Sequence, residues 1–252
     1  MFLDCRILAV NLAPARLAKA ATLLSLLSGL ILPVRADSPA KSDLESQILE
    51  VIRQNPEVIL ESLSRYQQRQ EKAKLEQRAG LVRAIGVSPA QYVADSPVFG
   101  RQSAKKILFV FADFQCPYCA QVRGALQDFV LSHPDVSLVY KHYPLTEIHP
   151  QAMAAAMASW AAQQQGKFWQ FHDILYAHQD RLGDDLYLKA AKELGLNIAK
   201  FNADRASSNA SAGIKRDLEL AEGLGLSGTP FFLLNGQTFS GVVDADFLRK
   251  QL

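Results

Sequence analysis

The 252-residue sequence is poor in cysteine, carries almost no net charge and lacks an apolar run of membrane-spanning length. Three cysteines are too few for a small scaffold that disulfides hold together, and a formal charge of +2 gives no electrostatic basis for binding nucleic acid. The longest uncharged leucine-rich run, residues 20–34, is shorter than the roughly 20 apolar residues that cross a bilayer. What remains is a globular chain, 49% hydrophobic, with enough apolar residues for a sizeable core.

The N-terminal residues have the pattern of a secretory signal. Three basic residues precede the uncharged run, and Val34-Arg35-Ala36 follows with small or short residues at the positions that a signal peptidase reads. We predict that residues 1–36 are a cleaved signal peptide, with an uncleaved membrane anchor as the alternative. Cys5 would leave with the signal, so the mature chain would keep only Cys116 and Cys119.

Residues 37–86 have a helical pattern and are predicted to form an N-terminal extension. Ser42 and Glu45 fit a capping box, which predicts that the first helix begins there, and apolar residues follow at helical spacing. Asn55 followed by Pro56 fits the N-cap and first position of a second helix.

Residues 67–78, within this extension, are almost all polar and have few apolar side chains to bury. Two short amphipathic helices beside such a stretch cannot form a core alone. They pack either on their own domain or on the same helices of a second copy, and the long polar stretch favours the second arrangement. We therefore predict a homo-oligomer that forms through residues 42–80.

From Lys105 onward, strand and helix patterns alternate, which is typical of an α/β domain. Residues 107–111 form a continuous apolar, β-prone run, as expected of a buried central strand. The later segments are a strand at 136–143, several helices within 150–216 that three glycines divide, a hairpin with an Asn-Gly turn at 231–240, and a short helix at 245–252.

The motif Cys116-Pro117-Tyr118-Cys119 follows the central strand directly and begins a helix. At a helix N-terminus, free backbone N–H groups and the positive dipole end stabilise a thiolate, so we expect a lowered pKa for Cys116. Cys119 lies one turn later on the same side, close enough to form a disulfide. Pro117 is compatible with the first helical turn. The motif predicts a reactive, easily reduced disulfide.

Two other uses of the pair are weaker. A zinc site would need two further ligands, but no second cysteine pair exists, and His172 and His178 fall outside the usual spacing. A purely structural disulfide would close so small a loop that it would restrict the unfolded chain little. We therefore predict redox chemistry at these two cysteines, with no metal and no cofactor.

Four separated segments resemble the DsbA-like thiol-disulfide oxidoreductases of the thioredoxin superfamily, in family order. They are Phe111-Ala112-Asp113-Phe114-Gln115-Cys116-Pro117-Tyr118-Cys119, Tyr143-Pro144-Leu145 with His149-Pro150-Gln151-Ala152, Gly166-Lys167-Phe168-Trp169 with Phe171-His172-Asp173, and Gly228-Thr229-Pro230-Phe231-Phe232. The resemblance implies a thioredoxin-like fold over residues 87–252 with a helical domain inserted at about 146–226. The helical extension resembles that of exported oligomeric members, including Com1-like proteins.

The resemblance also implies a role for each matching residue. Cys116 matches the nucleophilic cysteine and Cys119 the resolving one. Pro230 matches a cis-proline whose loop faces the disulfide, and Thr229 before it would pair with a substrate peptide through its backbone. Pro117 and Tyr118, between the two cysteines, would tune the redox site.

One position departs from the family pattern. Many thioredoxin-like proteins bury an acidic residue six positions before the first cysteine, where this chain has Val110, so we expect proton transfer at Cys119 to use water or another group. Asp113 is at a different position and fits a solvated strand end. Phe114 and Tyr118 could add apolar surface beside the sulfurs, although an aromatic residue next to a strand more often serves simple packing. The five histidines are expected to have surface or capping roles, with an approach of His142 to the redox site as the alternative.

The implied activity is thiol-disulfide exchange with cysteine-containing exported proteins. As an oxidase the protein would be reoxidised by a membrane redox partner, whereas as an oligomeric isomerase or reductase it would be kept reduced. We favour an oxidase in the periplasm, or otherwise exported, with outer-membrane association as a further option. A non-catalytic holdase or surface binding protein that retains the fold is the alternative from another class.

Overall fold

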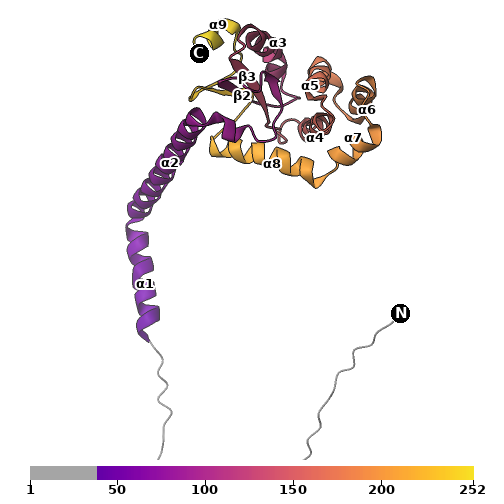
Figure 1. The fold of residues 1–252 in the computed structure, drawn as a ribbon. Helices are drawn as coiled ribbons and strands as arrows, with labels where there is room; N and C mark the ends of the chain where they lie inside the picture. The colour runs from indigo at the N-terminus through magenta and orange to yellow at the C-terminus, as the bar shows by residue number, and fades with distance from the viewer. Residues whose placement is uncertain (1–38) are drawn as a thin grey trace, which may run out of the picture. The chain divides into compact units, whose positions relative to one another are not determined.

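The computed structural model describes residues 39–252, so the predicted signal peptide with Cys5 lies outside the described residues. The chain divides into two compact units, Met1–Val58 and Ile59–Leu252. The first unit contributes helix α1 (Pro39–Gln54), and helix α2 (Pro56–Val87) belongs mainly to the second. The second unit contains the sheet, the other helices and the Cys-x-x-Cys motif (Figure 1).

In the extension, the first helix begins earlier than predicted, and the second begins as predicted but without the expected side-chain cap. Helix α1 begins at Pro39, ahead of Ser42, so the capping-box prediction is wrong; proline is well suited to the first turn of a helix. A second helix does begin at Pro56, as predicted. Asn55 does not cap it with its side chain, because Nδ2 donates backward to the carbonyl oxygen of Val51 (2.8 Å) and thereby completes the end of α1.

Five strands within the described residues form one mixed sheet in the order β1-β3-β2-β4-β5. Strand β2 pairs in parallel with β3, and the other neighbouring pairs are antiparallel. The bounds are β1 (Val98–Gly100), β2 (Lys106–Ala112), β3 (Val136–His142), β4 (Phe231–Leu234) and β5 (Gln237–Ser240). The central position of the apolar run in β2 is confirmed, whereas the three-residue β1 was not predicted because so short a segment shows no periodicity.

The predicted Asn-Gly hairpin joins β4 to β5. Asn235 and Gly236 both have positive φ, 52° and 74°. Positive φ at both central residues is the geometry of a type I′ turn, whose twist matches that of the two strands. The hairpin prediction is confirmed.

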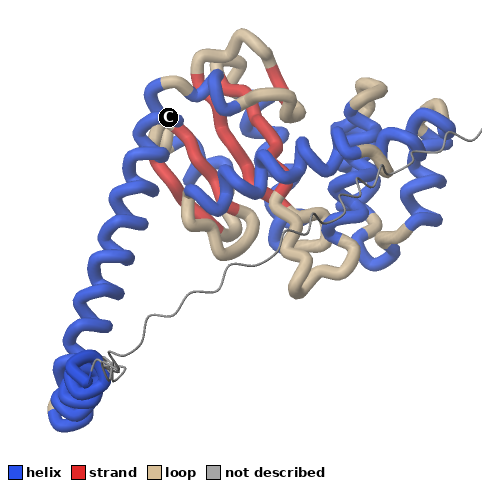
Figure 2. The backbone as a smooth tube through the Cα atoms, turned by 90° about the horizontal axis from the view of Figure 1, so that it is seen from below, coloured by secondary structure: helices blue, strands red, loops and turns tan. Residues whose placement is uncertain are grey.

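One face of the sheet packs against helix α3 (Pro117–Ser132), helix α9 (Ala245–Arg249) and the first four of the helices inserted between β3 and β4. The apolar spacing in α3 explains its orientation, since Val122, Leu126 and Phe129 are buried in the same core as Leu108 and Val110 of β2. Figure 2 shows the strands between helices on either side.

The opposite face is covered by the ends of α2 and α8. Ile85 of α2 and Ala221 of α8 pack with Phe109 and Phe111 of β2 in a second apolar cluster. The outward alternation along β2 therefore places Leu108 and Val110 in one core and Phe109 and Phe111 in the other.

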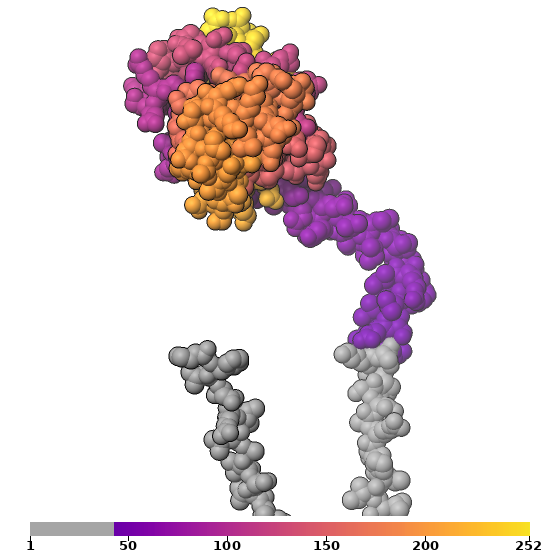
Figure 3. Space-filling view, turned by 90° about the vertical axis from the view of Figure 1, so that its right-hand side faces the viewer, coloured from indigo at the N-terminus to yellow at the C-terminus, as the bar shows by residue number. Residues whose placement is uncertain are grey.

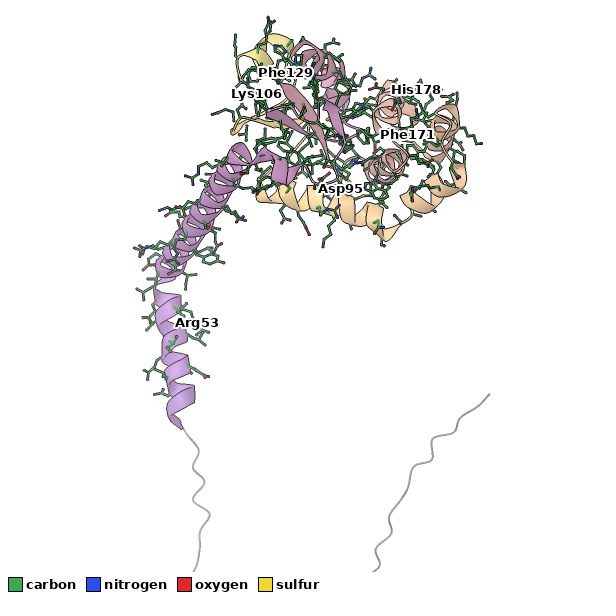
Figure 4. All side chains as sticks on the ribbon, viewed as in Figure 1. Arg53, Asp95, Lys106, Phe129, Phe171 and His178 are labelled. Carbon is green, nitrogen blue, oxygen red and sulfur yellow. The ribbon has the colours of Figure 1, made fainter. Side chains whose placement is uncertain are left out.

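The inserted helices are α4 (Ala152–Gln163), α5 (Phe168–Ala177), α6 (Asp184–Glu193), α7 (Ile198–Arg205) and α8 (Ser208–Gly223). A short 3-10 turn, η2 (Gln179–Arg181), lies between α5 and α6, and another, η1 (Pro89–Tyr92), lies between α2 and β1. Gly166, Gly183 and Gly195 lie between helices, as the sequence predicted. Figure 3 shows the face that the later inserted helices form, coloured orange. Figure 4 labels Phe129 of α3 and Phe171 of α5, which belong to one continuous core.

Candidate active site

The Cys-x-x-Cys motif lies where β2 leads into α3. Cys116 is the N-cap residue, with extended backbone angles, and Pro117 occupies the first turn. The backbone N–H groups of Cys119 and Ala120 donate to the Cys116 carbonyl at 3.1 and 3.3 Å. Cys116 and Cys119 are both buried free thiols, one turn apart at the start of the helix.

The environment of Cys116 stabilises a thiolate. The hydrogen bond from the Cys119 side chain is the largest influence and, helped by Thr229 and the backbone N–H groups of Cys119 and Tyr118, it overcomes burial and lowers the pKa of Cys116 to about 5. The helix N-terminus thus supplies the backbone donors that the sequence predicts. Near neutral pH, Cys116 is a thiolate and an effective nucleophile and leaving group.

The environment of Cys119 has the opposite effect. Burial, the side chain of Cys116 and the negative charge on that cysteine raise the pKa of Cys119 well above its ordinary value. Cys119 therefore keeps its proton whenever Cys116 is a thiolate. Any step in which Cys119 attacks or leaves requires a proton acceptor or donor beside it.

The loop that contains Thr229 and Pro230 faces the two sulfurs. The Thr229-Pro230 peptide bond is cis, which confirms the expectation from the resemblance. The Cys116 thiol donates to the Thr229 carbonyl at 3.3 Å. The Thr229 side chain, on the same loop, acts to lower the pKa of both cysteines.

The two aromatic residues near the motif have different environments. Phe114 is 1% exposed and stacks on Tyr140 with a 5.3 Å separation of ring centroids, so simple packing is confirmed for it over a role beside the sulfurs. It is drawn inward because buried aromatic rings surround it on several sides. Tyr118 is 59% exposed and remains available to a partner molecule.

Asp113 is not a solvated strand end, and that expectation is wrong. The residue is 2% exposed. Its carboxylate accepts hydrogen bonds from the backbone N–H groups of Gln115 (2.8 Å) and Leu145 (2.9 Å) and from His149 Nδ1 (2.7 Å). A buried carboxylate with three donors is well compensated. Asp113 therefore fixes the turn before Cys116 to the loop after β3.

A second anchor for this turn comes from Gln179, in the short segment after α5. Its Nε2 donates to the carbonyl oxygens of Phe114 (2.7 Å) and Cys116 (2.9 Å). This role was not predictable from the sequence, because an isolated glutamine 63 positions away carries no local signal. The inserted helices thus hold the backbone of the reactive cysteine directly.

Two histidines are also buried, contrary to the expectation of surface or capping roles. His142 at the end of β3 has no hydrogen-bond partner on either ring nitrogen within the described residues. His172 in α5 forms a hydrogen bond between its Nδ1 and Asp173 Oδ1 at 2.9 Å. Both rings are buried because they pack among Phe114, Tyr140 and Phe168.

The described part of the chain shows neither a metal centre nor a membrane span. No group of three or more histidine, cysteine, aspartate or glutamate side chains within residues 39–252 is arranged to hold a metal ion. None of the helices in that range combines the length and apolar character that crossing a bilayer requires.

Comparisons with known proteins agree with this geometry. The family model described as the DSBA-like thioredoxin domain matches residues 107–252. That range contains β2, the Cys-x-x-Cys motif, the inserted helices and the loop with the cis-proline.

A curated relative is the Na(+)/H(+) antiporter NhaA 3 of Salinispora tropica, which is 37% identical over 151 residues. The match covers 60% of this chain but only 23% of the antiporter. The likeness therefore concerns a minor part of that longer protein.

Solved structures show the same fold. A thioredoxin-like oxidoreductase from Silicibacter pomeroyi DSS-3 is 30% identical, with a TM-score of 0.59, and the match covers 63% of this chain and 90% of that one. Proteus mirabilis ScsC in a transitional conformation is 22% identical, with a TM-score of 0.58, and the match covers 83% of this chain and 92% of that one.

Proposed function

Because this chain belongs to the DsbA-like thioredoxin domain family, we propose that it is an exported protein disulfide oxidoreductase that uses Cys116 and Cys119. The observation that carries the proposal is the opposite environment of the two thiols. The pKa of Cys116 is lowered to about 5 and that of Cys119 is raised, which separates a nucleophile from a resolving thiol within one helical turn.

The exchange takes place in two steps. A client thiolate attacks Cys116 Sγ of the oxidised pair, the Cys116–Cys119 bond breaks, and Cys119 leaves and takes up a proton. A second client thiolate then attacks the client sulfur of the mixed disulfide, and Cys116 leaves as a thiolate. The client gains a disulfide and the pair is reduced, so two electrons pass from the client to this protein.

The direction we propose is oxidation of clients. A thiolate that its surroundings stabilise favours the reduced form, and this makes the disulfide a stronger oxidant. The partner that restores the disulfide would be a membrane redox protein. The clients would be exported proteins with free cysteines, and the leader-like pattern in residues 1–36 supports export to the periplasm.

An oligomeric isomerase or reductase is the second candidate, and the extension favours it. Large apolar side chains of α1 and α2 are exposed at helical spacing, among them Leu44, Ile48, Ile59 and Leu63. An exposed apolar row of this kind is typical of an interaction surface. We propose that residues 42–80 join copies of this chain, which would restrict access to the site.

Catalysis itself is tested with a client whose disulfides form slowly without help. Wild-type protein should accelerate oxidation of the reduced client, and Cys116→Ser should abolish the acceleration. Cys119→Ala should accumulate a Cys116–client mixed disulfide on non-reducing gels. A Cys116→Ser variant with wild-type activity would instead support a non-catalytic holdase.

A redox titration against glutathione distinguishes the two directions. An oxidase should have a reduction potential close to about −120 mV, whereas a value near about −270 mV is typical of a reductant. The titration uses the mature chain, with the Cys116→Ser variant as the blank.

A further inference from the structure

A small cavity lies against Cys119, and the cis-proline Pro230 also lines it. Its volume is about 10 Å³, which is the space of one water molecule. Cys119, Tyr140, His172 and Tyr176 line this cavity together with apolar residues, including Val110. Val110 stands at the position where many related proteins bury an acid, so in this chain the proton of Cys119 passes to water or to a different residue.

His172 is the candidate with the right chemistry. It is 4% exposed, and its Nδ1 lies 2.9 Å from Asp173 Oδ1. Burial alone would raise the pKa of Asp173, but hydrogen bonds and charges, with His172 and Arg123 among them, lower it, so the carboxylate is ionised and accepts. Nδ1 therefore carries the hydrogen, and Nε2, which has no protein partner within residues 39–252, is free to accept a proton.

Asp173 connects this pair to solvent. Its side chain is 41% exposed, and its Oδ1 also accepts from Gln127 Nε2 at 3.1 Å and pairs with Arg123 at 3.3 Å. Gln127 and Arg123 both line the same cavity. The arrangement is a buried imidazole held by a carboxylate whose far side reaches water, as in other sites where a carboxylate orients a histidine base.

We propose that His172 is the proton-relay residue for Cys119, exchanging the thiol proton through one water in this cavity, with Asp173 as its positioning residue. The proposal rests on the proposed function, since it concerns the second cysteine of the same exchange.

The relay acts in both directions. When Cys119 attacks Cys116 Sγ of a mixed disulfide, its proton passes through the water to His172 Nε2, the Cys116–Cys119 bond forms, and the client sulfur leaves with its electron pair. In the reverse step a client thiolate breaks the Cys116–Cys119 bond, and the Cys119 thiolate recovers the proton from His172. Neither direction needs a further oxidant or reductant, because the sulfur that leaves keeps the electron pair of the broken bond.

The other titratable groups near His172 are less suited to accept the proton of Cys119. Burial raises the pKa of Tyr140 and Tyr176 well above the ordinary value, and their hydroxyls bond each other at 3.1 Å. Burial lowers the pKa of both buried histidines, and for His142, with the charge of Lys141, to about 3. His172 differs from His142 in that it lines the cavity and has the Asp173 carboxylate beside it, which acts to raise its pKa. The groups that face His172 are Cys119 and Arg123 from α3, Tyr140 and His142 from β3, and Asp173 and Tyr176 from α5.

The test separates the two cysteines in one stopped-flow experiment. Reduced full-length mature protein is mixed with dithiobis(nitrobenzoate), an aryl disulfide whose thiolate product is coloured. The first phase reports attack by Cys116, and the second reports attack by Cys119 on the mixed disulfide. His172→Gln should leave the first phase unchanged and slow the second about 10²-fold near neutral pH, which is the lower range for a positioned proton-transfer group.

The pH profile supplies a readout that a structural role would not change. In wild type, the second-phase rate should level off once His172 is unprotonated. In His172→Gln it should keep rising in proportion to hydroxide, because solvent hydroxide replaces the missing base. Asp173→Asn, a substitution near the surface, should slow the second phase by a smaller factor and decides the matter if His172→Gln does not fold.

His142→Phe is the matched control, since it replaces the other buried imidazole of the same aromatic cluster and should leave both phases at the wild-type rate. A wild-type second phase and pH profile in both His172→Gln and Asp173→Asn would refute the relay. Loss of the second phase in Tyr176→Phe but not in His172→Gln would also refute it. Absence of the first phase in wild type would refute the proposed function instead.

Discussion

At the residue scale, Cys116 and Cys119 have the same chemistry and opposite surroundings. Hydrogen-bond donors from Cys119 and from the helix start lower the pKa of Cys116. Burial and the negative charge of Cys116 raise the pKa of Cys119. The pair therefore titrates as a unit in which one proton is released easily and the other is retained. This asymmetry leads to two predictions.

The first prediction concerns stability of the reduced protein. The folded-state pKa of Cys116 is about 5, and an unfolded cysteine titrates at about 8.5. Because the folded pKa is depressed, the stabilisation is complete above the unfolded pKa and is lost as the pH falls through the folded one. The free energy of unfolding of the reduced form should thus rise with pH between about 5 and 8.5.

Urea unfolding across this pH range measures the effect. Cys119 keeps its proton in folded and unfolded chains over most of the window, so it does not obscure the trend. The Cys116→Ser variant and the oxidised protein lack the titration and serve as controls. An equally steep rise in Cys116→Ser would contradict the prediction.

The second prediction concerns the Thr229 hydroxyl. It helps to lower the pKa of Cys116. Thr229→Val keeps the shape of the side chain but removes the donor, so the pKa of Cys116 should rise above its value of about 5. Thiolate absorbance during a pH titration measures it, with Thr229→Ser, which retains the hydroxyl, as the control. No difference between the two variants would exclude a hydroxyl contribution.

At the element scale, close packing of two glycines joins α2 to the sheet. A Cβ on Gly86 would lie 2.9 Å from the Cα of Gly236 and 3.2 Å from its backbone nitrogen. Gly236 is in the turn between β4 and β5 and has a φ of 74°. Neither backbone can move easily, so only glycine permits this approach of helix and hairpin.

We therefore predict that Gly86→Ala destabilises the second unit by about 1–3 kcal/mol, because it forces two backbones apart. Gly80→Ala lies in the same helix with nothing within 4 Å of the added Cβ, and it should stabilise by about 0.5–1 kcal/mol through helix propensity. Denaturant midpoints of the two variants measure the contrast. Equal midpoints would show that the helix does not depend on this contact.

A buried ion pair also joins elements that are distant in the chain. Lys141 Nζ on β3 lies 3.0 Å from Asp217 Oδ1 on α8, and Asp217 Oδ2 accepts from the backbone N–H of His142 at 2.9 Å. Lys141 donates further to Ser96 Oγ at 2.7 Å. Breaking a buried pair of this kind is costly because it leaves one charge uncompensated. The pair fixes α8 across the sheet and was not predictable from an unremarkable helical pattern.

At the scale of the whole molecule, the extension exposes apolar side chains that the described residues of one copy do not cover. Leu60 is 67% exposed and Val51 is 60% exposed. We predict that Ile59→Glu combined with Leu63→Glu converts an oligomer into monomers, because charges replace an apolar contact row. Sedimentation velocity of residues 37–252 measures the mass.

Leu131→Glu is the control for this experiment, since Leu131 is an exposed apolar residue of α3, outside residues 42–80. It should leave the oligomer intact. A monomeric wild-type chain, or an oligomer that persists in the double variant, would contradict assembly through the extension. If the monomeric variant gains oxidase activity towards clients, restricted access in the oligomer explains the difference.

The sequence by itself determined the order of the longer strands and helices, the hairpin and the reactive pair, but not the three-residue β1. Local periodicity, the Asn235-Gly236 turn and the spacing of Cys116 and Cys119 are properties of neighbouring residues, so they can be read without a fold. The absence of an acid at Val110 was visible in the same way, and it correctly raised the question of how Cys119 exchanges its proton.

Only the tertiary structure decided which side chains surround that pair. Asp113 is buried because donors from the loop after β3 meet it, and His172 lies beside the Cys119 cavity because α5 packs on the sheet. Thr229 faces the sulfurs from more than a hundred positions away. Such contacts depend on chain segments that meet only after folding, and the charge state of each thiol depends on those contacts.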